Sequence, residues 1–320
     1  MTAEDIKADV INDNNLAIQT NSLTKIFGSL VAVYGVNLEI KKGELFAFLG
    51  PNGAGKSTTI NMLCCLLKAT SGSASIMGYD INRQTYKVKG LIGVSPQETT
   101  LSEHLNSMEN LRLIGSLHNI ESKKLKTWSE IMLEKMGLTD RAKDQVRNFS
   151  GGMKRRLSIA MALIHDPPVI FLDEPTLGLD PQARRAVWEY IVRLKGEKTI
   201  LLTTHYMEEA DFLADRIGII DDGKIVALGN PGDLKAEMVD THTLVVYAWN
   251  ITQKAILEMR KLYSDVKINN GTIEISGKKI DFKNIVDNLH SLGVIIRSAH
   301  FKEPTLEDVF LKITGKELRT

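Results

Sequence analysis

The stretch AFLGPNGAGKSTTI, residues 47–60, decides the fold of this chain. A polar turn follows an apolar run here, and residues 50–57, GPNGAGKS, fit the spacing G-x-x-x-x-G-K-[ST]. An apolar strand before this spacing and a helix after it distinguish a phosphate-binding loop from a chance match. Glycines let the backbone curl so that its N–H groups converge on phosphate oxygens, and the helix N-terminus adds a positive pole. The stretch therefore predicts a nucleotide-binding loop between a strand and a helix.

The polar side chains of this loop predict a metal ion beside the nucleotide. Lys56 is expected to reach the β- and γ-phosphates, and the hydroxyl of Ser57 is expected to bind Mg²⁺. The residues expected around the nucleotide are Gly50, Pro51, Asn52, Gly53, Ala54, Gly55, Lys56, Ser57 and Thr58.

A second apolar run ends in two adjacent acids, in the stretch VIFLDEP at 169–175. Two carboxylates at the end of a buried strand are costly unless they face a cation. We expect Asp173 to hold Mg²⁺, directly or through water, and Glu174 to polarise the attacking water as a general base. The alternative is an ordinary surface turn before Pro175.

Residues 16–239 are expected to form one α/β domain. Short apolar runs alternate there with stretches of helical spacing, such as 121–138 and 181–196. In the first of these stretches, Trp128 has the spacing of a core residue, together with Leu125, Met132 and Met136. Such runs suit strands that are buried on both faces of a parallel sheet, and strands alternating with helices form layered α/β domains. The expected strands are residues 45–50, 91–96, 168–173, 198–205 and 216–221.

Three other parts of the chain follow different patterns. Residues 16–27 and 32–45 are typical of antiparallel strands, which predicts a small β layer beside the parallel sheet. Residues 240–320 indicate strand, helix, hairpin, helix and strand in turn, with an Asn270–Gly271 turn, and predict a small α+β domain. The acidic and polar residues 1–15 do not resemble a secretory signal and are expected to form a flexible tail.

Composition excludes several classes of protein. The chain has 320 residues, a net charge of +1 and two adjacent cysteines, Cys64 and Cys65. This charge gives no broad field to attract nucleic acid, and neighbouring cysteines do not easily reach disulfide geometry, so a reducing compartment fits. No apolar run reaches about 18 residues, so we expect no membrane span and any membrane contact only through a partner.

In their order along the chain, these motifs resemble the nucleotide-binding subunits of ATP-binding-cassette (ABC) transporters. Besides the two stretches quoted above, FSGGMKRRL at 149–157 is similar to the family's signature motif, and LGLD at 177–180 is similar to its D-loop. Gln97 looks like the family's glutamine-loop residue, and His205 like its switch histidine. The resemblance covers residues 16–234 and implies a P-loop ATPase, with a parallel sheet core, an antiparallel β layer and a helical subdomain.

The resemblance also implies that ATP binds between two subunits. Ser150, Gly151, Gly152 and Met153 begin an expected helix, where a hydroxyl, bare amides and the helix N-terminus form an anion site. In the family a second subunit presents this site, so that two ATP molecules are enclosed head to tail, here expected in a homodimer with two-fold symmetry. The family's fullest signature has leucine and glutamine where this chain has Phe149 and Met153, which leaves the Ser-Gly-Gly intact.

Four further site residues depend on the resemblance. Gln97 is expected to contact Mg²⁺ and to face the membrane partner, and His205 to hydrogen-bond the γ-phosphate and the attacking water. Phe27 lies where the family keeps an aromatic side chain that stacks on adenine, although a core position is the alternative. Asp180 is expected at the dimer interface or as the N-cap of a helix that begins at Pro181.

The C-terminal stretch narrows the expected partners. Residues 303–318, EPTLEDVFLKITGKEL, are similar to the tail of drug, antibiotic and nodulation-factor exporter ATPases, which work with separate ABC-2 type transmembrane permease subunits. This implies a cytoplasmic subunit on the inner face of the membrane. The helical arm after Gln97 is either solvated surface or a groove for a partner helix. The small domain either dimerises or regulates, or it only stabilises the chain.

We therefore expect the ATP-hydrolysing subunit of an exporter, and two other functions remain as alternatives. One is a soluble ABC ATPase that acts on nucleic acid or ribosomes, but those relatives usually carry two cassettes, long coiled coils or zinc modules. The other is a non-catalytic subunit, which the intact Lys56, Asp173, Glu174 and His205 disfavour. Import instead of export stays open, because only the tail bears on direction.

Overall fold

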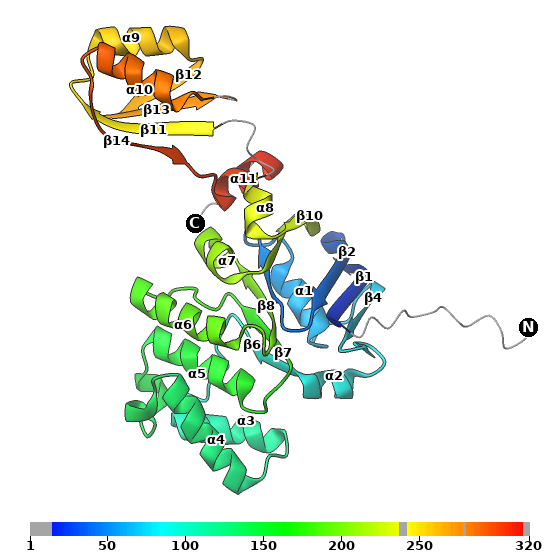
Figure 1. The fold of residues 1–320 in the computed structure, drawn as a ribbon. Helices are drawn as coiled ribbons and strands as arrows, with labels where there is room; N and C mark the ends of the chain where they lie inside the picture. The colour runs from blue at the N-terminus through cyan, green and yellow to red at the C-terminus, as the bar shows by residue number, and fades with distance from the viewer. Residues whose placement is uncertain (1–14, 237–241, 270, 278–279, 316–320) are drawn as a thin grey trace, which may run out of the picture. The chain divides into compact units, whose positions relative to one another are not determined.

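The computed structural model describes residues 15–236, 242–269, 271–277 and 280–315 (Figure 1). The chain divides into two compact units between Pro231 and Gly232. The division falls at the start of α8 (Pro231–Ala236), earlier than the domain boundary expected at residue 239. That boundary lies outside the described residues, as does the expected tail at residues 1–15 except for Asn15.

A six-stranded sheet forms the centre of the first unit. Its strand order is β10-β9-β3-β8-β7-β6, in which all neighbours pair in parallel except β10, an antiparallel edge strand. The strands are β3 (Leu45–Leu49), β6 (Ile92–Ser95), β7 (Val169–Asp173), β8 (Thr199–Thr204), β9 (Arg216–Asp221) and β10 (Lys224–Gly229). Every residue of β3, β7 and β8 is buried, as expected for a parallel sheet covered on both faces.

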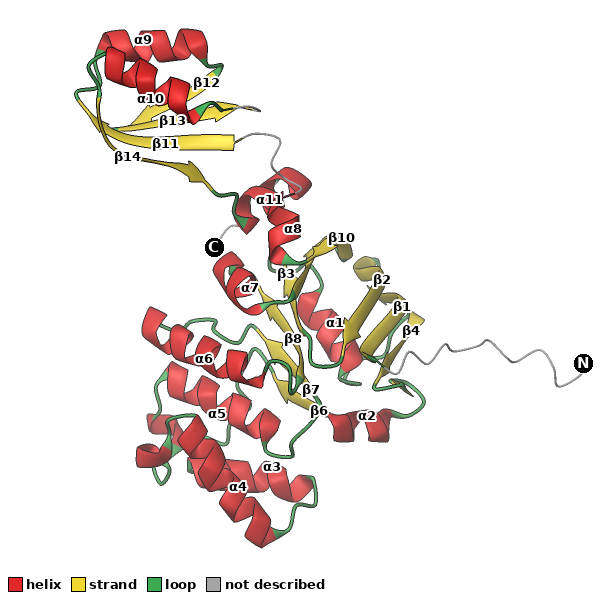
Figure 2. Ribbon diagram, in the orientation of Figure 1, coloured by secondary structure: helices red, strands yellow, loops and turns green. Residues whose placement is uncertain are grey.

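An antiparallel sheet of order β2-β1-β4-β5 lies beside the parallel sheet, which confirms the predicted β layer. Its strands are β1 (Leu16–Phe27), β2 (Leu30–Lys41), β4 (Ser71–Ile76) and β5 (Tyr79–Asp80). One continuous apolar core joins the two sheets through side chains such as Leu38, Phe48 and Phe171. Helix α1 (Lys56–Leu63) packs between the sheets (Figure 2).

The remaining helices of the first unit lie mostly on the other side of the parallel sheet (Figure 2). They are α2 (Thr85–Leu91), α3 (Ser107–Leu117), α4 (Ser122–Lys135), α5 (Gly151–Leu163), α6 (Pro181–Leu194) and α7 (Met207–Leu213), with single 3-10 turns at Thr139–Arg141 and Val146–Asn148. On α4 the buried row is Leu125, Ser129 and Leu133, so Trp128 is not the core residue that its spacing suggested. Its ring is only half-buried, and Lys124 Nζ lies over it, 4.1 Å from the ring centroid.

The second unit is a four-stranded antiparallel sheet with two helices on one face (Figure 1), in agreement with the α+β expectation. Its elements are β11 (His242–Trp249), α9 (Gln253–Leu262), β12 (Asp265–Asn269), β13 (Thr272–Gly277), α10 (Phe282–Ser291), β14 (Ile295–Lys302) and α11 (Leu306–Thr314). Alternate residues of β11, such as Leu244 and Val246, pack against Met259 and Leu289 of the helices. Asn270 of the expected hairpin turn lies outside the described residues.

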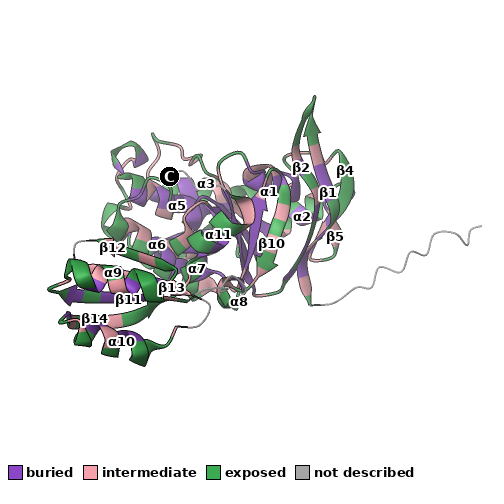
Figure 3. Cartoon of the chain, turned by 90° about the horizontal axis from the view of Figure 1, so that it is seen from above, coloured by how far each residue is buried: buried purple, intermediate pink, exposed green. Residues whose placement is uncertain are grey.

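No helix in the described ranges is both long enough and apolar enough to cross a bilayer. Burial is instead concentrated inside each unit, where the central strands are covered and the outer helical faces are exposed (Figure 3). Phe48 illustrates this core: its side chain is fully buried and packs edge-on against Phe46 at a centroid distance of 5.3 Å.

Replacing Phe48 with alanine should destabilise the first unit by about 3–5 kcal/mol, because a buried phenyl ring is lost and a cavity remains. Tyr86→Ala removes an aromatic ring that is 89% exposed, and it should change the free energy of unfolding by less than about 0.5 kcal/mol. Urea unfolding followed by circular dichroism measures both. Equal losses for the two variants would contradict the assigned core.

A stacked histidine pair makes the stability of this unit depend on pH. The rings of His118 and His165 lie 3.7 Å apart between centroids, and His165 Nε2 is 3.0 Å from the carbonyl oxygen of Ile92. Burial, with a smaller contribution from His118, lowers the pKa of His165 from 6.5 to about 4. Between these two values the unfolded chain binds a proton that the folded chain excludes, so stability falls as the pH falls.

His165→Gln should make the loss of stability between about pH 6.5 and pH 4 shallower, because the variant has no imidazole to protonate on unfolding. Urea midpoints measured across this window give the slope, and the exposed His290 provides the control variant His290→Gln. The same slope in wild type and His165→Gln would show that this ring is not protonated on unfolding.

Candidate active site

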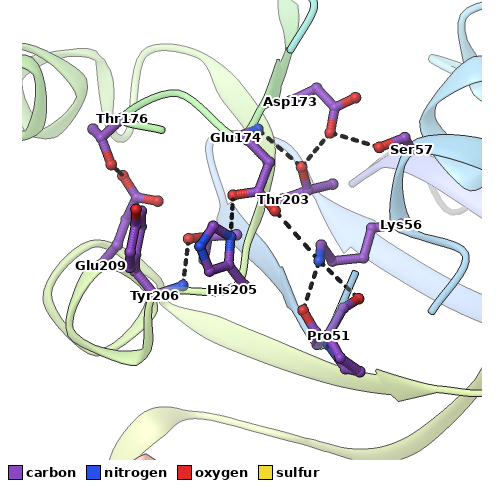
Figure 4. A network of polar contacts seen from close by, with 12 residues as sticks. Pro51, Lys56, Ser57, Asp173, Glu174, Thr176, Thr203, His205, Tyr206 and Glu209 are labelled. Carbon is purple, nitrogen blue, oxygen red and sulfur yellow. Dashed lines mark hydrogen bonds and ion pairs between the residues drawn. The ribbon is translucent and has the colours of Figure 1, made fainter. Parts of the chain in front are cut away.

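Three of the predicted groups, the loop of residues 50–57, the paired acids and His205, come together at one edge of the parallel sheet. Carboxyl ends of parallel strands meet at the same edge, where open α/β sheets bind their ligands. Strand β8 lies between β3 and β7, so the loop after β3, the acids at the end of β7 and His205 after β8 are neighbours (Figure 4). Residues from three distant stretches of sequence thus face one another.

The loop of residues 50–57 requires glycine at two positions. Gly55 has a φ of +102°, and a Cβ there would lie 2.5 Å from the carbonyl oxygen of Ala32. A Cβ on Gly50 would lie 2.2 Å from the carbonyl oxygen of Ile220. Strand β3 ends before this loop and α1 begins at Lys56, which is the strand-loop-helix context that the spacing predicted.

Lys56 is held inside the loop by its own backbone and by an acid. Its ammonium donates hydrogen bonds to the carbonyl oxygens of Gly50 at 2.6 Å and Pro51 at 3.2 Å. Its Nζ also lies 3.3 Å from Oε1 of Glu174 (Figure 4). Burial lowers the pKa of Lys56, and the charge of Glu174 opposes this shift. The ammonium therefore stands between the loop and the proposed base.

Oxygen atoms suitable for a magnesium ion gather around Asp173. The hydroxyl of Ser57 donates to Asp173 Oδ1 at 3.1 Å, and the hydroxyl of Thr203 donates to the same oxygen at 2.5 Å. Mg²⁺ prefers such oxygen ligands and is usually held by one or two carboxylates together with substrate phosphates. Among the described residues, no group of three or more His, Cys, Asp or Glu side chains could hold a metal ion by itself. The hydroxyl and carboxylate oxygens of Ser57 and Asp173 are of the type that Mg²⁺ prefers.

Glu174 is fixed through both its backbone and its carboxylate. Its φ of +48° lies in the left-handed region, and its amide donates to the carbonyl and hydroxyl oxygens of Thr203 at 3.1 and 3.0 Å. The side chain is 3% exposed, and Oε2 lies 2.9 Å from His205 Nδ1. The structure thus brings the predicted base and the predicted switch histidine into direct contact (Figure 4).

Other predicted residues lie apart from this cluster. Gln97 is exposed after β6, and Phe27 is exposed at the end of β1, where Lys25 Nζ lies 4.9 Å from its ring centre. Ser150 and Asp180 cap their own helices: Ser150 Oγ accepts from the Met153 amide at 3.3 Å, and Asp180 Oδ1 accepts from the amide of Ala183 at 2.9 Å.

The beginning of α5 packs closely on α6. A Cβ at Gly152 would lie 2.9 Å from the Cβ of Ala183, so this glycine allows the two helices to approach. Gly151 and Ser150 are exposed beside it, while Gly152 is buried. The signature residues therefore lie at the surface of the first unit, on a helix whose start is fixed by α6.

Two buried charged residues beside the site escaped the sequence interpretation. Arg155 lies on α5, and its guanidinium donates to the carbonyl oxygens of Asp173 at 2.5 Å and Pro175 at 2.8 Å. Burial lowers its pKa to about 10, so it stays charged at neutral pH. The one available signal was its helical spacing from Gly152, three residues earlier on the buried face of α5.

Glu209 of α7 is the second buried charge. Its Oε1 accepts hydrogen bonds from the hydroxyl of Thr176 at 2.7 Å and the indole N–H of Trp188 at 2.8 Å. Burial raises the pKa of this carboxyl group. Glu209 lies on α7, the helix that follows His205, and its hydrogen bonds connect α7 to the turn after Glu174 and to α6. These contacts support the segments that carry Glu174 and His205.

Comparison with known proteins agrees with this geometry. The ABC transporter family model matches residues 33–177. The linearmycin resistance ATP-binding protein LnrL of Bacillus subtilis is 38% identical over 94% of this chain and 99% of its own length. The Nod factor export ATP-binding protein I of Cupriavidus metallidurans is 37% identical over 94% of this chain and 98% of that protein.

A solved structure of a similar cassette contains ADP and Pi. The ATP-binding cassette MJ0796, described as a dimeric post-hydrolysis state bound to ADP and Pi, matches 67% of this chain and 98% of its own with a TM-score of 0.62 and 28% identity. These relatives give no support to the alternative of an ATPase acting on nucleic acid. The phosphate loop, the paired acids and the comparisons agree: the chain belongs to the ATP-binding subunits of ABC transporters, and its cassette binds and hydrolyses ATP.

Proposed function

We propose that this chain hydrolyses MgATP with Glu174 as general base. The observation that carries the proposal is the position of its carboxylate, with one oxygen 3.3 Å from Lys56 Nζ and the other 2.9 Å from His205 Nδ1. A base held beside the phosphate loop is placed to take a proton from water that attacks the γ-phosphate. Lys56 and His205 then stabilise the charge that develops on the phosphate oxygens.

Three residues would hold the metal ion: Ser57, Asp173 and Gln97. The first two already share a hydrogen bond, and the Gln97 side chain is exposed after β6. When bound, Mg²⁺ neutralises phosphate charge and orients the nucleotide. The hydroxyl of Thr203 donates a hydrogen bond to Asp173 Oδ1, which helps to keep this carboxylate oriented toward the metal position. Phe27, exposed at the end of β1, would stack on the adenine.

We further propose that two copies enclose the nucleotides. Ser150 and Gly151 are exposed at the N-terminus of α5, where a hydroxyl and free amides suit a phosphate presented by another subunit. Asp180 lies at the exposed start of α6, within reach of the same interface. The MJ0796 cassette is dimeric, which supports this arrangement.

The membrane partner is proposed to dock on the helical arm. A hollow of about 750 Å³ opens between α2, α3 and α4, lined among others by Tyr86, Lys89, Leu117, His118, Lys124 and Trp128. A wide hollow with apolar and basic side chains suits a helix that carries an apolar anchor and an acid. We infer that this helix belongs to an ABC-2 type permease, so the chain acts on the cytoplasmic face of the membrane.

Export is the direction that the relatives support. LnrL is named for linearmycin resistance and the Cupriavidus protein for Nod factor export, and both match this chain over nearly its full length. We propose that ATP-driven closure and reopening of the dimer move an amphiphilic or drug-like molecule outward through the permease.

Glu174→Gln should still bind MgATP but hydrolyse it roughly 10²-fold more slowly or worse, because the amide does not accept the proton. Steady-state release of phosphate gives kcat, and nucleotide affinity is measured separately by calorimetry. Glu208→Gln changes an acid of α7 outside the cluster and serves as the matched control. Near-normal turnover in Glu174→Gln would refute the role given to this carboxylate.

A further inference from the structure

Arg155 joins three segments that lie far apart in the sequence. Besides the carbonyl oxygens of Asp173 and Pro175, its guanidinium donates to those of Pro96 at 2.5 Å and Gln97 at 3.4 Å. The side chain is only 3% exposed. A single buried cation on α5 therefore contacts the end of β7 and the start of the glutamine loop.

The contacts with Asp173, the last residue of β7, and with Pro175 flank the proposed base. Asp173 and Pro175 are the residues before and after Glu174, whose φ is +48°. A residue other than glycine keeps such a backbone conformation only where its surroundings hold it. Thr203 restrains the Glu174 amide from one side, and Arg155 restrains the neighbouring carbonyl oxygens from the other.

The other contacts reach a segment that carries a proposed metal ligand. Arg155 holds the backbone of Gln97, while the Gln97 side chain remains exposed. The same helix α5 begins at the signature residues, five residues before Arg155 at its cap Ser150. Because a helix moves as a rigid element, a shift of its N-terminal end or of the glutamine loop is transmitted to Arg155.

We propose that Arg155 is a positioning residue, which sets the backbone on both sides of Glu174 and makes it dependent on the glutamine loop and the signature helix. The inference rests on the proposed role of Glu174 as the general base. Arginine suits this position because its planar fork presents five N–H donors at once. A lysine ammonium has three donors on one atom and does not span carbonyl groups on separate segments.

Two substitutions test the proposal in the full chain. Arg155→Gln removes the guanidinium group. Arg155→Lys keeps the positive charge and the buried aliphatic part of the side chain. Both should lower kcat by about 10- to 100-fold, because small displacements of a catalytic group have effects of that size. The Kd for MgATP should stay within about threefold of wild type, because the hydrogen bonds of the Arg155 guanidinium go to main-chain carbonyl oxygens of residues 96–97 and 173–175 and not to residues 50–57.

Arg216→Gln is the matched control. Arg216 also bridges separate segments, donating to the Glu39 carbonyl oxygen and to the Glu44 carboxylate, each at 3.0 Å, but it lies at the start of β9 away from Glu174. This variant should lose stability without losing kcat. If Arg155→Gln fails to fold, Arg155→Lys carries the test, with retained MgATP binding as the measure of folding.

A double-mutant cycle separates positioning from a general structural effect. Single-turnover hydrolysis is measured for wild type, Glu174→Gln, Arg155→Gln and the double variant. If Arg155 acts through Glu174, its substitution should slow the Glu174→Gln background by less than about threefold, since residues that act as a unit are not additive.

Equal slowing in both backgrounds, or a loss confined to MgATP affinity, would overturn the proposal for Arg155. Near-normal hydrolysis by Glu174→Gln alone would instead overturn the proposed function. The two failures are therefore distinguishable in one set of measurements.

Discussion

Parallel pairing of β3, β8 and β7 is the constraint on which the site depends. Because these strands lie side by side, the phosphate loop, His205 and the acids at their ends lie at one edge of the sheet. No one of the three loops holds the full set of groups needed for phosphoryl transfer. The register matters as well, because Asp173 pairs with Thr203 across β7 and β8, and this places the Thr203 hydroxyl on the Asp173 carboxylate. Chemistry at this edge is thus a consequence of strand order.

The charges at this edge form a buried ion pair. Lys56 and Glu174 are 5% and 3% exposed, and each finds its counter-charge in the other. Removing charges from water is costly unless geometry and hydrogen bonds compensate, and here loop carbonyl oxygens and His205 supply those bonds. Inside a buried site, such fixed charges act strongly on a phosphoryl group. The same groups that stabilise the buried pair are therefore those proposed for catalysis.

Much of this architecture was predictable from local sequence patterns. Buried strands such as Leu45–Leu49 appear as uninterrupted apolar runs, and the spacing of residues 50–57 specifies both the loop and the helix after it. Trp128 was wrongly expected in the core, because residues three and four positions after Leu125 both fit helical spacing. Packing in the folded chain buries Ser129 and leaves Trp128 half-buried. Arg155 was missed because a basic residue in the run KRR suggests a solvated surface. Its burial depends on carbonyl oxygens from residues 96–97 and 173–175, which only the folded chain brings together.

The central claim is that the loop of residues 50–57 binds the triphosphate through its amides and Lys56. Calorimetric titration of MgATP into the wild-type chain and into Lys56→Ala tests it most directly. We predict saturable binding to the wild type and a loss of affinity of at least about tenfold in the variant, since one buried charge-assisted contact is worth about 1.5–3 kcal/mol. Failure of the wild-type chain to bind MgATP, or equal affinity in both proteins, would contradict the account.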